Sequence, residues 1–235
     1  VFVHETVLNR SRLDQATRHE VQIELARDYL QAGLLDRAES MSVALAQENP
    51  EYRSDSLKVT LQVYEQERDW HRAIETAKQI TGDDGGASIE PSISHYWCEL
   101  AELSLAGQEF LEASAHLTQA IGHDAQNPRV SLLQGAVALQ SGDAEAAIHF
   151  FERVLDQDPG YVSESLQSLE QAHQLQGSEA RYRAYLERCL DQDPSISVVL
   201  ALGRVIQSSE GDAALARFIA NQMQKNPTLR GFIEL

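Results

Sequence analysis

The chain has 235 residues, of which 43% are apolar and 6% aromatic, and its formal net charge is −17. This charge argues against binding to nucleic acid or anionic lipid, because both need a basic protein face that displaces counterions. Only two cysteines occur, Cys98 and Cys189, so there is no disulfide framework and a reducing compartment is favoured. No run approaches the roughly 20 apolar residues that would cross a bilayer.

The first residues, from Val1 to Leu8, are typical of the second helix of a helix-pair repeat. We therefore interpret residues 1–18 as the second helix of a truncated repeat, and we expect the chain to be a fragment of a longer protein. The apolar side chains of this helix would normally cover another helix, so they could also pair two copies of the chain as a homodimer.

Residues 19–235 contain a pattern that returns at near-constant spacing. The first full unit runs from Glu20 to Pro50, with Tyr29 in its first helix and the small Ala38 in its second. Tyr64 and Ala73 stand 35 positions after Tyr29 and Ala38. Two helices joined by a short turn can approach closely only where a side chain is small.

A glycine-rich and aspartate-rich run, residues 81–92, then interrupts the period. Ala73 and Ala113 are 40 positions apart, so extra residues lie between them. Glycine and aspartate supply turn chemistry, and we expect a loop insertion within an array that continues beyond it.

The stretch from Trp97 to Pro159 carries the clearest self-similarity. Four positions recur at an offset of 34 residues, namely Ala101 as Gly135, Ala113 as Ala147, Leu117 as Phe151 and Ala120 as Val154. A 34-residue period of this kind is typical of tetratricopeptide (TPR) repeats. The sequence therefore predicts an all-α fold, a TPR superhelical solenoid of antiparallel helix pairs with about six repeats in residues 19–235.

The last repeats are less regular. Gly177 to Pro194 aligns without gaps on Gly142 to Pro159, but Tyr182 replaces the small Ala147, which predicts wider packing. A final unit has Gly203 in its first helix, and residues 228–235 are expected to begin another helix.

Catalytic and metal-binding spacings are not found in this sequence. His95 and Cys98 lie three positions apart on one predicted helix and could supply two metal ligands, but a structural site needs four. Their ordinary interpretation is a groove-lining or packed pair, since a free cysteine behaves as a small hydrophobe. We predict a protein that is not an enzyme and that holds no metal or cofactor in this part of the chain.

Repeat arrays bind partners on a concave surface lined by their first helices. Counting from the register of the repeats, the side chains expected there include Arg27, Lys58, Gln62, His95, Cys98, Arg129, Leu132 and Arg204. Basic residues are scarce, at 19 against 36 acidic ones, so their presence at these positions suggests an acidic peptide ligand. The alternative is that they neutralise neighbouring acids such as Glu20 and Glu102.

Several ordered stretches resemble a known family more closely than the general TPR pattern does. They are Ala26 to Glu39, His95 to Ala101, Ala125 to Ser131, Glu152 to Asp158, Val162 to Leu166 and Asn226 to Arg230. Together they resemble the cytoplasmic TPR region of the lipopolysaccharide assembly protein B (LapB) family over nearly the whole chain.

This resemblance implies an adaptor at the cytoplasmic face of the inner membrane of Gram-negative bacteria. Such an adaptor presents the lipid A committed-step deacetylase (LpxC) to the membrane AAA+ protease FtsH, so that regulated proteolysis restrains lipopolysaccharide biosynthesis. Other lipopolysaccharide assembly proteins are further expected partners.

Family members also carry an N-terminal membrane helix and a C-terminal rubredoxin-like metal domain, and neither is in this sequence, so the fragment is expected to be soluble.

Two alternatives to the adaptor function remain. One is a generic TPR peptide-binding scaffold or co-chaperone, which would need clustered Lys, Arg and Asn residues. The other is a hydrolase, for which no nucleophile and base can be named.

Overall fold

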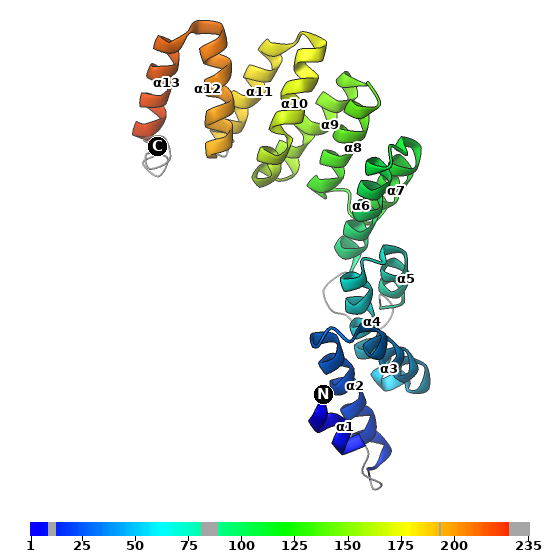
Figure 1. Ribbon diagram of the computed structural model, residues 1–235. Helices are drawn as coiled ribbons and strands as arrows, with labels where there is room; N and C mark the ends of the chain where they lie inside the picture. The colour runs from blue at the N-terminus through cyan, green and yellow to red at the C-terminus, as the bar shows by residue number, and fades with distance from the viewer. Residues whose placement is uncertain (9–12, 81–88, 193, 226–235) are drawn as a thin grey trace. The chain divides into compact units, whose positions relative to one another are not determined.

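The computed structural model describes residues 1–8, 13–80, 89–192 and 194–225 (Figure 1). These residues form thirteen α-helices and two short 3-10 helices, and they contain no strand. The predicted all-α TPR fold is confirmed. None of the helices in the described ranges is both long and apolar enough to span a membrane.

The chain divides into two compact units, one of residues 1–103 and 118–125, and the other of residues 104–117 and 126–235. Helices α6 and α7 contribute residues to both units. In chain order the α-helices are α1 (Phe2–Leu8), α2 (Gln15–Gln31), α3 (Leu35–Glu48), α4 (Arg53–Glu67), α5 (Trp70–Ile80), α6 (Glu90–Ala106), α7 (Phe110–His123), α8 (Pro128–Gln140), α9 (Ala144–Gln157), α10 (Val162–Gln176), α11 (Glu179–Gln192), α12 (Ile196–Glu210) and α13 (Asp212–Lys225).

The beginning of the chain differs from the single helix expected for residues 1–18. Helix α1 ends at Leu8, and α2 begins at Gln15 because Asp14 caps it, with its Oδ1 accepting a hydrogen bond from the Thr17 N–H at 2.9 Å. Residues 1–18 thus contain α1 and the start of α2. Phe2 and Val3 are exposed, and pairing of two copies through them stays a prediction.

The expected insertion at 81–92 falls mostly outside the described residues, which resume at residue 89. Its last three positions, 90–92, belong to α6 instead of a loop. The helix expected at 228–235 also lies outside the described residues.

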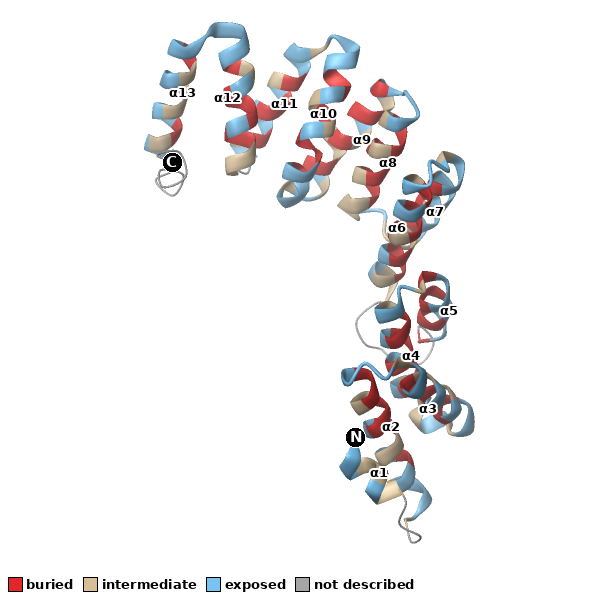
Figure 2. Cartoon of the chain, in the orientation of Figure 1, coloured by how far each residue is buried: buried red, intermediate tan, exposed pale blue. Residues whose placement is uncertain are grey.

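Buried positions lie mainly where paired helices face each other (Figure 2), and the small residues that define the repeat are among the buried ones. Ala38, Ala73, Ala113 and Ala147 are all 0% exposed. At Gly135 a Cβ atom would stand 2.5 Å from Cε1 of Phe151, so the ring occupies the space that a side chain would need. The helices therefore approach one another where the sequence predicted.

Tyr182 shows how a large residue is accommodated at the alanine position. Its side chain is 2% exposed, and its hydroxyl donates a hydrogen bond to the carbonyl oxygen of Leu166 at 3.2 Å. The phenol thus packs inside the repeat with its polar end satisfied.

Five helix pairs are joined by the same tight turn. The N–H groups of Leu34, Asp69, Glu109, Asp143 and Ser178 each donate to the carbonyl five positions earlier, at 2.8 to 2.9 Å. This is the six-to-one hydrogen bond of a Schellman motif, which needs a left-handed residue just after the helix. Glycine takes that position at 33, 142 and 177, whereas Arg68 and Gln108 take it with φ of 56° and 60°.

We predict that Ala147→Leu destabilises the chain by about 1 to 3 kcal/mol, because the added methyl groups overpack a fully buried contact. Chemical denaturation measures the change. Ala213→Leu, at an exposed position of α13, is the matched control and should leave stability within about 0.5 kcal/mol. Equal stability of the two variants would contradict close packing at Ala147.

We further predict that Arg68→Gly stabilises the chain by about 0.5 to 1 kcal/mol, because glycine adopts a positive φ without the steric cost that arginine has there. Arg217→Gly, inside α13, should instead destabilise it by about 1 kcal/mol. Thermal unfolding of both variants checks the difference in sign.

Candidate functional site

The partner-binding side chains predicted from the repeat register differ in their exposure. Lys58, Gln62, His95 and Arg204 are exposed, and Arg27, Arg129 and Leu132 are partly exposed. Cys98 is 0% exposed, so its predicted place on a binding surface is wrong. It packs inside its repeat as a small apolar side chain.

The basic residues Arg27, Lys58 and Arg204 lie beside carboxylates. A guanidinium nitrogen of Arg27 is 2.5 Å from Glu24, and the Lys58 ammonium is 3.4 Å from Asp55. The Arg204 guanidinium, on α12, is 3.4 Å from the Glu170 carboxylate, on α10. These contacts favour the alternative that the basic residues neutralise neighbouring acids, and they weaken the case for a basic peptide-binding stripe.

His95 has neighbours that explain it without a metal. Its ring packs edge-on against Trp70, with ring centroids 6.3 Å apart, and its Nε2 is 3.7 Å from Glu99. In the described ranges no group of three or more His, Cys, Asp or Glu side chains is placed to hold a metal ion.

One predicted residue, Arg204, lines a cavity. The hollow between α12 and α13 has a volume of about 210 Å³, and its walls are Val199, Leu200, Gly203, Arg204, Gln207, Leu215 and Ile219. Leu200 is 53% exposed, and a Cβ atom at Gly203 would stand 3.2 Å from Cδ1 of Leu215, so the glycine lets Leu215 pack closely against α12. The cavity is mainly apolar with one cation at its edge, which suits an aliphatic side chain of a protein partner.

A second cavity contains none of the partner-binding residues that the sequence analysis predicted. It has a volume of about 250 Å³ and is lined by Val43, Ala46, Gln47, Arg53, Leu57, Thr60, Tyr64, Arg72, Glu75, Thr76 and Gln79 of α3, α4 and α5. We call it the α3–α4–α5 cavity. At 3.6 residues per turn, its α4 residues lie on the side of that helix opposite Lys58 and Gln62.

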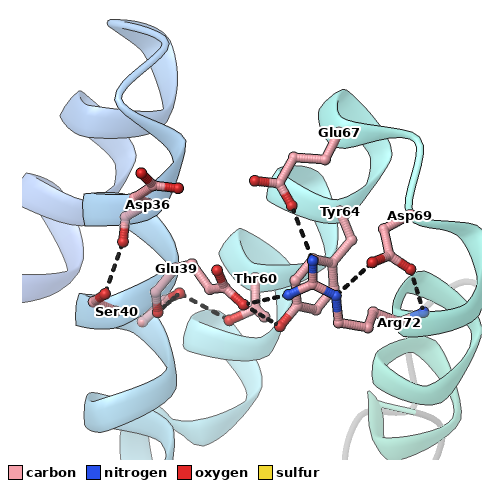
Figure 3. A network of polar contacts seen from close by, with 9 residues as sticks. Asp36, Glu39, Ser40, Thr60, Tyr64, Glu67, Asp69 and Arg72 are labelled. Atoms are coloured by element: carbon pink, nitrogen blue, oxygen red, sulfur yellow. Dashed lines mark hydrogen bonds and ion pairs between the residues drawn. The ribbon is translucent and has the colours of Figure 1, made fainter.

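Two residues of the cavity lining, Tyr64 and Arg72, belong to a network of charged and aromatic side chains (Figure 3). The Arg72 guanidinium lies 4.5 Å from the centre of the Tyr64 ring and contacts Glu39 at 2.9 Å, Asp69 at 2.6 Å and Glu67 at 3.5 Å. The Tyr64 hydroxyl donates to Glu39 at 2.7 Å. The network therefore ties α3, α4 and α5 together.

These contacts shift the pKa values of the groups involved. Burial of the phenol raises the pKa of Tyr64, and the hydrogen bond to Glu39 raises it further. The hydrogen bond from Arg72 lowers the pKa of Asp69. Asp69 and Arg72 thus stay charged, and Tyr64 stays a hydrogen-bond donor, over the ordinary range of pH.

The same network occurs one repeat earlier. Tyr29 precedes its turn as Tyr64 does, its hydroxyl donates to Glu5 at 2.7 Å, and Arg37 lies over its ring at 5.6 Å. The Glu5 carboxylate is 3.9 Å from Arg37. A tyrosine followed eight positions later by an arginine was the sequence signal that could have revealed both networks.

In the second unit a histidine takes the tyrosine position. His173 is fully buried, and Arg181, eight positions later, contacts Glu152 at 2.9 Å and Glu145 at 3.0 Å. The His173 Nε2 atom is 3.7 Å from Glu152, and burial lowers the pKa of the imidazole. The α9, α10 and α11 helices are thus linked as α3, α4 and α5 are.

We predict that Tyr64→Phe destabilises the chain by about 1 kcal/mol, because Glu39 loses a short hydrogen bond in a largely buried setting. Tyr161→Phe, which removes a hydroxyl from an exposed ring, is the control and should change stability little. Urea denaturation measures both. A loss that is the same for the two variants would show that the network does not stabilise the repeat.

The comparison with curated proteins found relatives along the whole chain. All 235 residues align at 31% identity with lipopolysaccharide assembly protein B of Escherichia coli K12, and 87% of the chain aligns at 27% identity with the Haemophilus influenzae protein of that name. The chain spans 60% and 51% of the lengths of these two relatives. No family model matches.

Solved structures give weaker similarity. A MamA crystal structure overlays with a TM-score of 0.49 at 18% identity, covering 75% of this chain and 92% of MamA. The TPR protein YrrB overlays with a TM-score of 0.46 at 14% identity, covering 77% of this chain and 89% of YrrB. Over its whole length, this chain is similar in sequence to lipopolysaccharide assembly protein B.

Proposed function

We propose that this chain is a non-enzymatic, protein-binding adaptor that acts in the regulation of lipopolysaccharide assembly. The observation that carries the proposal is the 31% identity to lipopolysaccharide assembly protein B over every residue of the chain. The helix-pair array supports it, since stacked repeats offer extended surfaces for partners.

The proposed mechanism is the presentation of one protein to another. In it the adaptor binds the lipid A committed-step deacetylase (LpxC) and brings it to the membrane AAA+ protease FtsH, which lowers lipopolysaccharide output. We place this event at the cytoplasmic face of the inner membrane.

The α12–α13 cavity is the contact point that we propose for one of these partners. Leu200 is a large apolar side chain that is half exposed at its edge, and Arg204 lies beside it with a side chain that is 60% exposed. An aliphatic side chain of a partner that enters the cavity would contact both Leu200 and the aliphatic part of the Arg204 side chain. A few such anchors carry most of the binding energy of an interface.

A generic peptide-binding scaffold or co-chaperone is the second candidate, and the charges do not favour it. Capture of a terminal carboxylate needs several unneutralised cations in neighbouring helices. Arg27, Lys58 and Arg204 each have a carboxylate within 3.4 Å.

The test is a binding measurement with purified partners and the full-length protein. Leu200→Asp together with Arg204→Glu should weaken binding of the deacetylase or the protease by about 100-fold, which corresponds to the loss of one anchor residue of about 2 to 3 kcal/mol. Arg129→Ala should weaken it less. Surface plasmon resonance with each partner gives the dissociation constants.

Arg217→Glu, an exposed charge reversal on α13, is the control and should bind like the unchanged protein. Circular dichroism of each variant shows that the array is still folded. If neither partner binds the unchanged protein, the adaptor proposal fails; if both bind and the α12–α13 variant is unaffected, the proposed contact point is wrong.

A further inference from the structure

The α3–α4–α5 cavity combines an apolar floor with rigid walls. Val43, Ala46 and the buried Leu57 supply aliphatic surface. The hydroxyl oxygens of Thr60 and Ser42 are hydrogen-bonded at 2.8 Å inside the wall, and Tyr64 is held by Glu39. Since the cavity is held open by these contacts, a ligand would not have to order it.

Arg53, at the edge of this cavity, differs from the other arginines that line cavities in the described chain. Arg72 and Arg204 contact carboxylates, as does Arg37, which lines a shallow hollow between α2 and α3. The Arg53 guanidinium instead donates to the neutral amide of Gln79 at 3.3 Å. It is an exposed cation in a chain with a net charge of −17.

The charges around the cavity select the kind of anion that fits. At the far end, Arg72 is outnumbered by Glu39, Glu67 and Asp69, and Glu75 also lines the wall. A phosphate dianion in the cavity would be repelled by these carboxylates and attracted by one guanidinium. A single carboxylate can pair with Arg53 through two parallel N–H···O bonds, which is the geometry that arginine prefers.

The volume limits the size of the ligand. About 250 Å³ is less than a drug-sized pocket and accepts one or two side chains. An acidic residue followed by an aliphatic one in a peptide would place its carboxylate on Arg53 and its apolar side chain on Leu57.

We propose that the α3–α4–α5 cavity is a docking site for an acidic-aliphatic segment of a partner protein, with Arg53 as the residue that recognises its carboxylate. The site lies on the side of α4 away from Lys58 and Gln62, so it is separate from the first-helix surface predicted from the repeats. The inference rests on the proposed protein-binding function and adds a second surface with its own ligand chemistry.

The test uses the full chain, labelled with ¹⁵N, and a blocked tripeptide of sequence Leu-Glu-Leu. Titration should shift the amide signals of α3, α4 and α5 and the Arg53 side-chain Nε–H signal in a saturable way. The Leu-Gln-Leu peptide should bind the chain about tenfold more weakly than Leu-Glu-Leu does. The Leu-Glu-Leu peptide should also bind the Arg53→Gln variant about tenfold more weakly than it binds the unchanged chain. Each change removes the charge-assisted pair.

Two further variants test the role of charge in the cavity wall. Glu75→Gln should tighten binding of the Glu peptide, since it removes a like charge from the wall, and Arg217→Gln should leave binding unchanged. Equal affinity for the Glu and Gln peptides, no saturable shift, or inorganic phosphate binding as tightly as the peptide would each overturn the proposal. None of these peptide results changes the outcome of the partner-binding measurements with the α12–α13 variant. The docking-site proposal can therefore fail while the adaptor proposal stands.

Discussion

The structure depends on the close approach of paired helices at positions where the side chain is a hydrogen or a methyl group. Ala38, Ala73 and Ala147 are completely buried, and at Gly135 the ring of Phe151 fills the space of the absent side chain. Dense packing at these points leaves no room for a larger residue unless the pair moves apart. Tyr182 is the exception, and its hydroxyl is satisfied by a backbone carbonyl.

Polar networks add a second level of organisation between successive repeats. A ring before the turn, an arginine eight residues later and glutamates from the preceding helix recur around Tyr29, Tyr64 and His173. In two other repeats the residue at this position before the turn is Ser104 or Ala138. Neither residue has a ring, and no arginine follows eight positions later. Ion pairs that share several partners are worth more than isolated surface pairs, so these networks fix the spacing of neighbouring helices in each of the two units.

The two cavities differ in what they offer to a partner. The α12–α13 cavity is mainly apolar and has a cation that Glu170 partly neutralises, so aliphatic contact should dominate there. The α3–α4–α5 cavity has a more polar wall and an arginine that donates to an amide, so a carboxylate should decide its specificity. An adaptor that must hold two proteins needs surfaces with different chemistry, because specificity is a difference of affinities.

The sequence by itself determined the fold class, the repeat period, the buried small residues and the relation to lipopolysaccharide assembly protein B. Periodicity determines the first three of these features, because it states which residues share one face of a helix. The relation to lipopolysaccharide assembly protein B rests instead on the ordered stretches that resemble that family. It could not show that Cys98 is buried, that Arg27 and Lys58 lie beside carboxylates, or that α3, α4 and α5 enclose a cavity beside Arg53. Those outcomes depend on how neighbouring helices close over a shared face, and only the tertiary structure decides which side chains meet there.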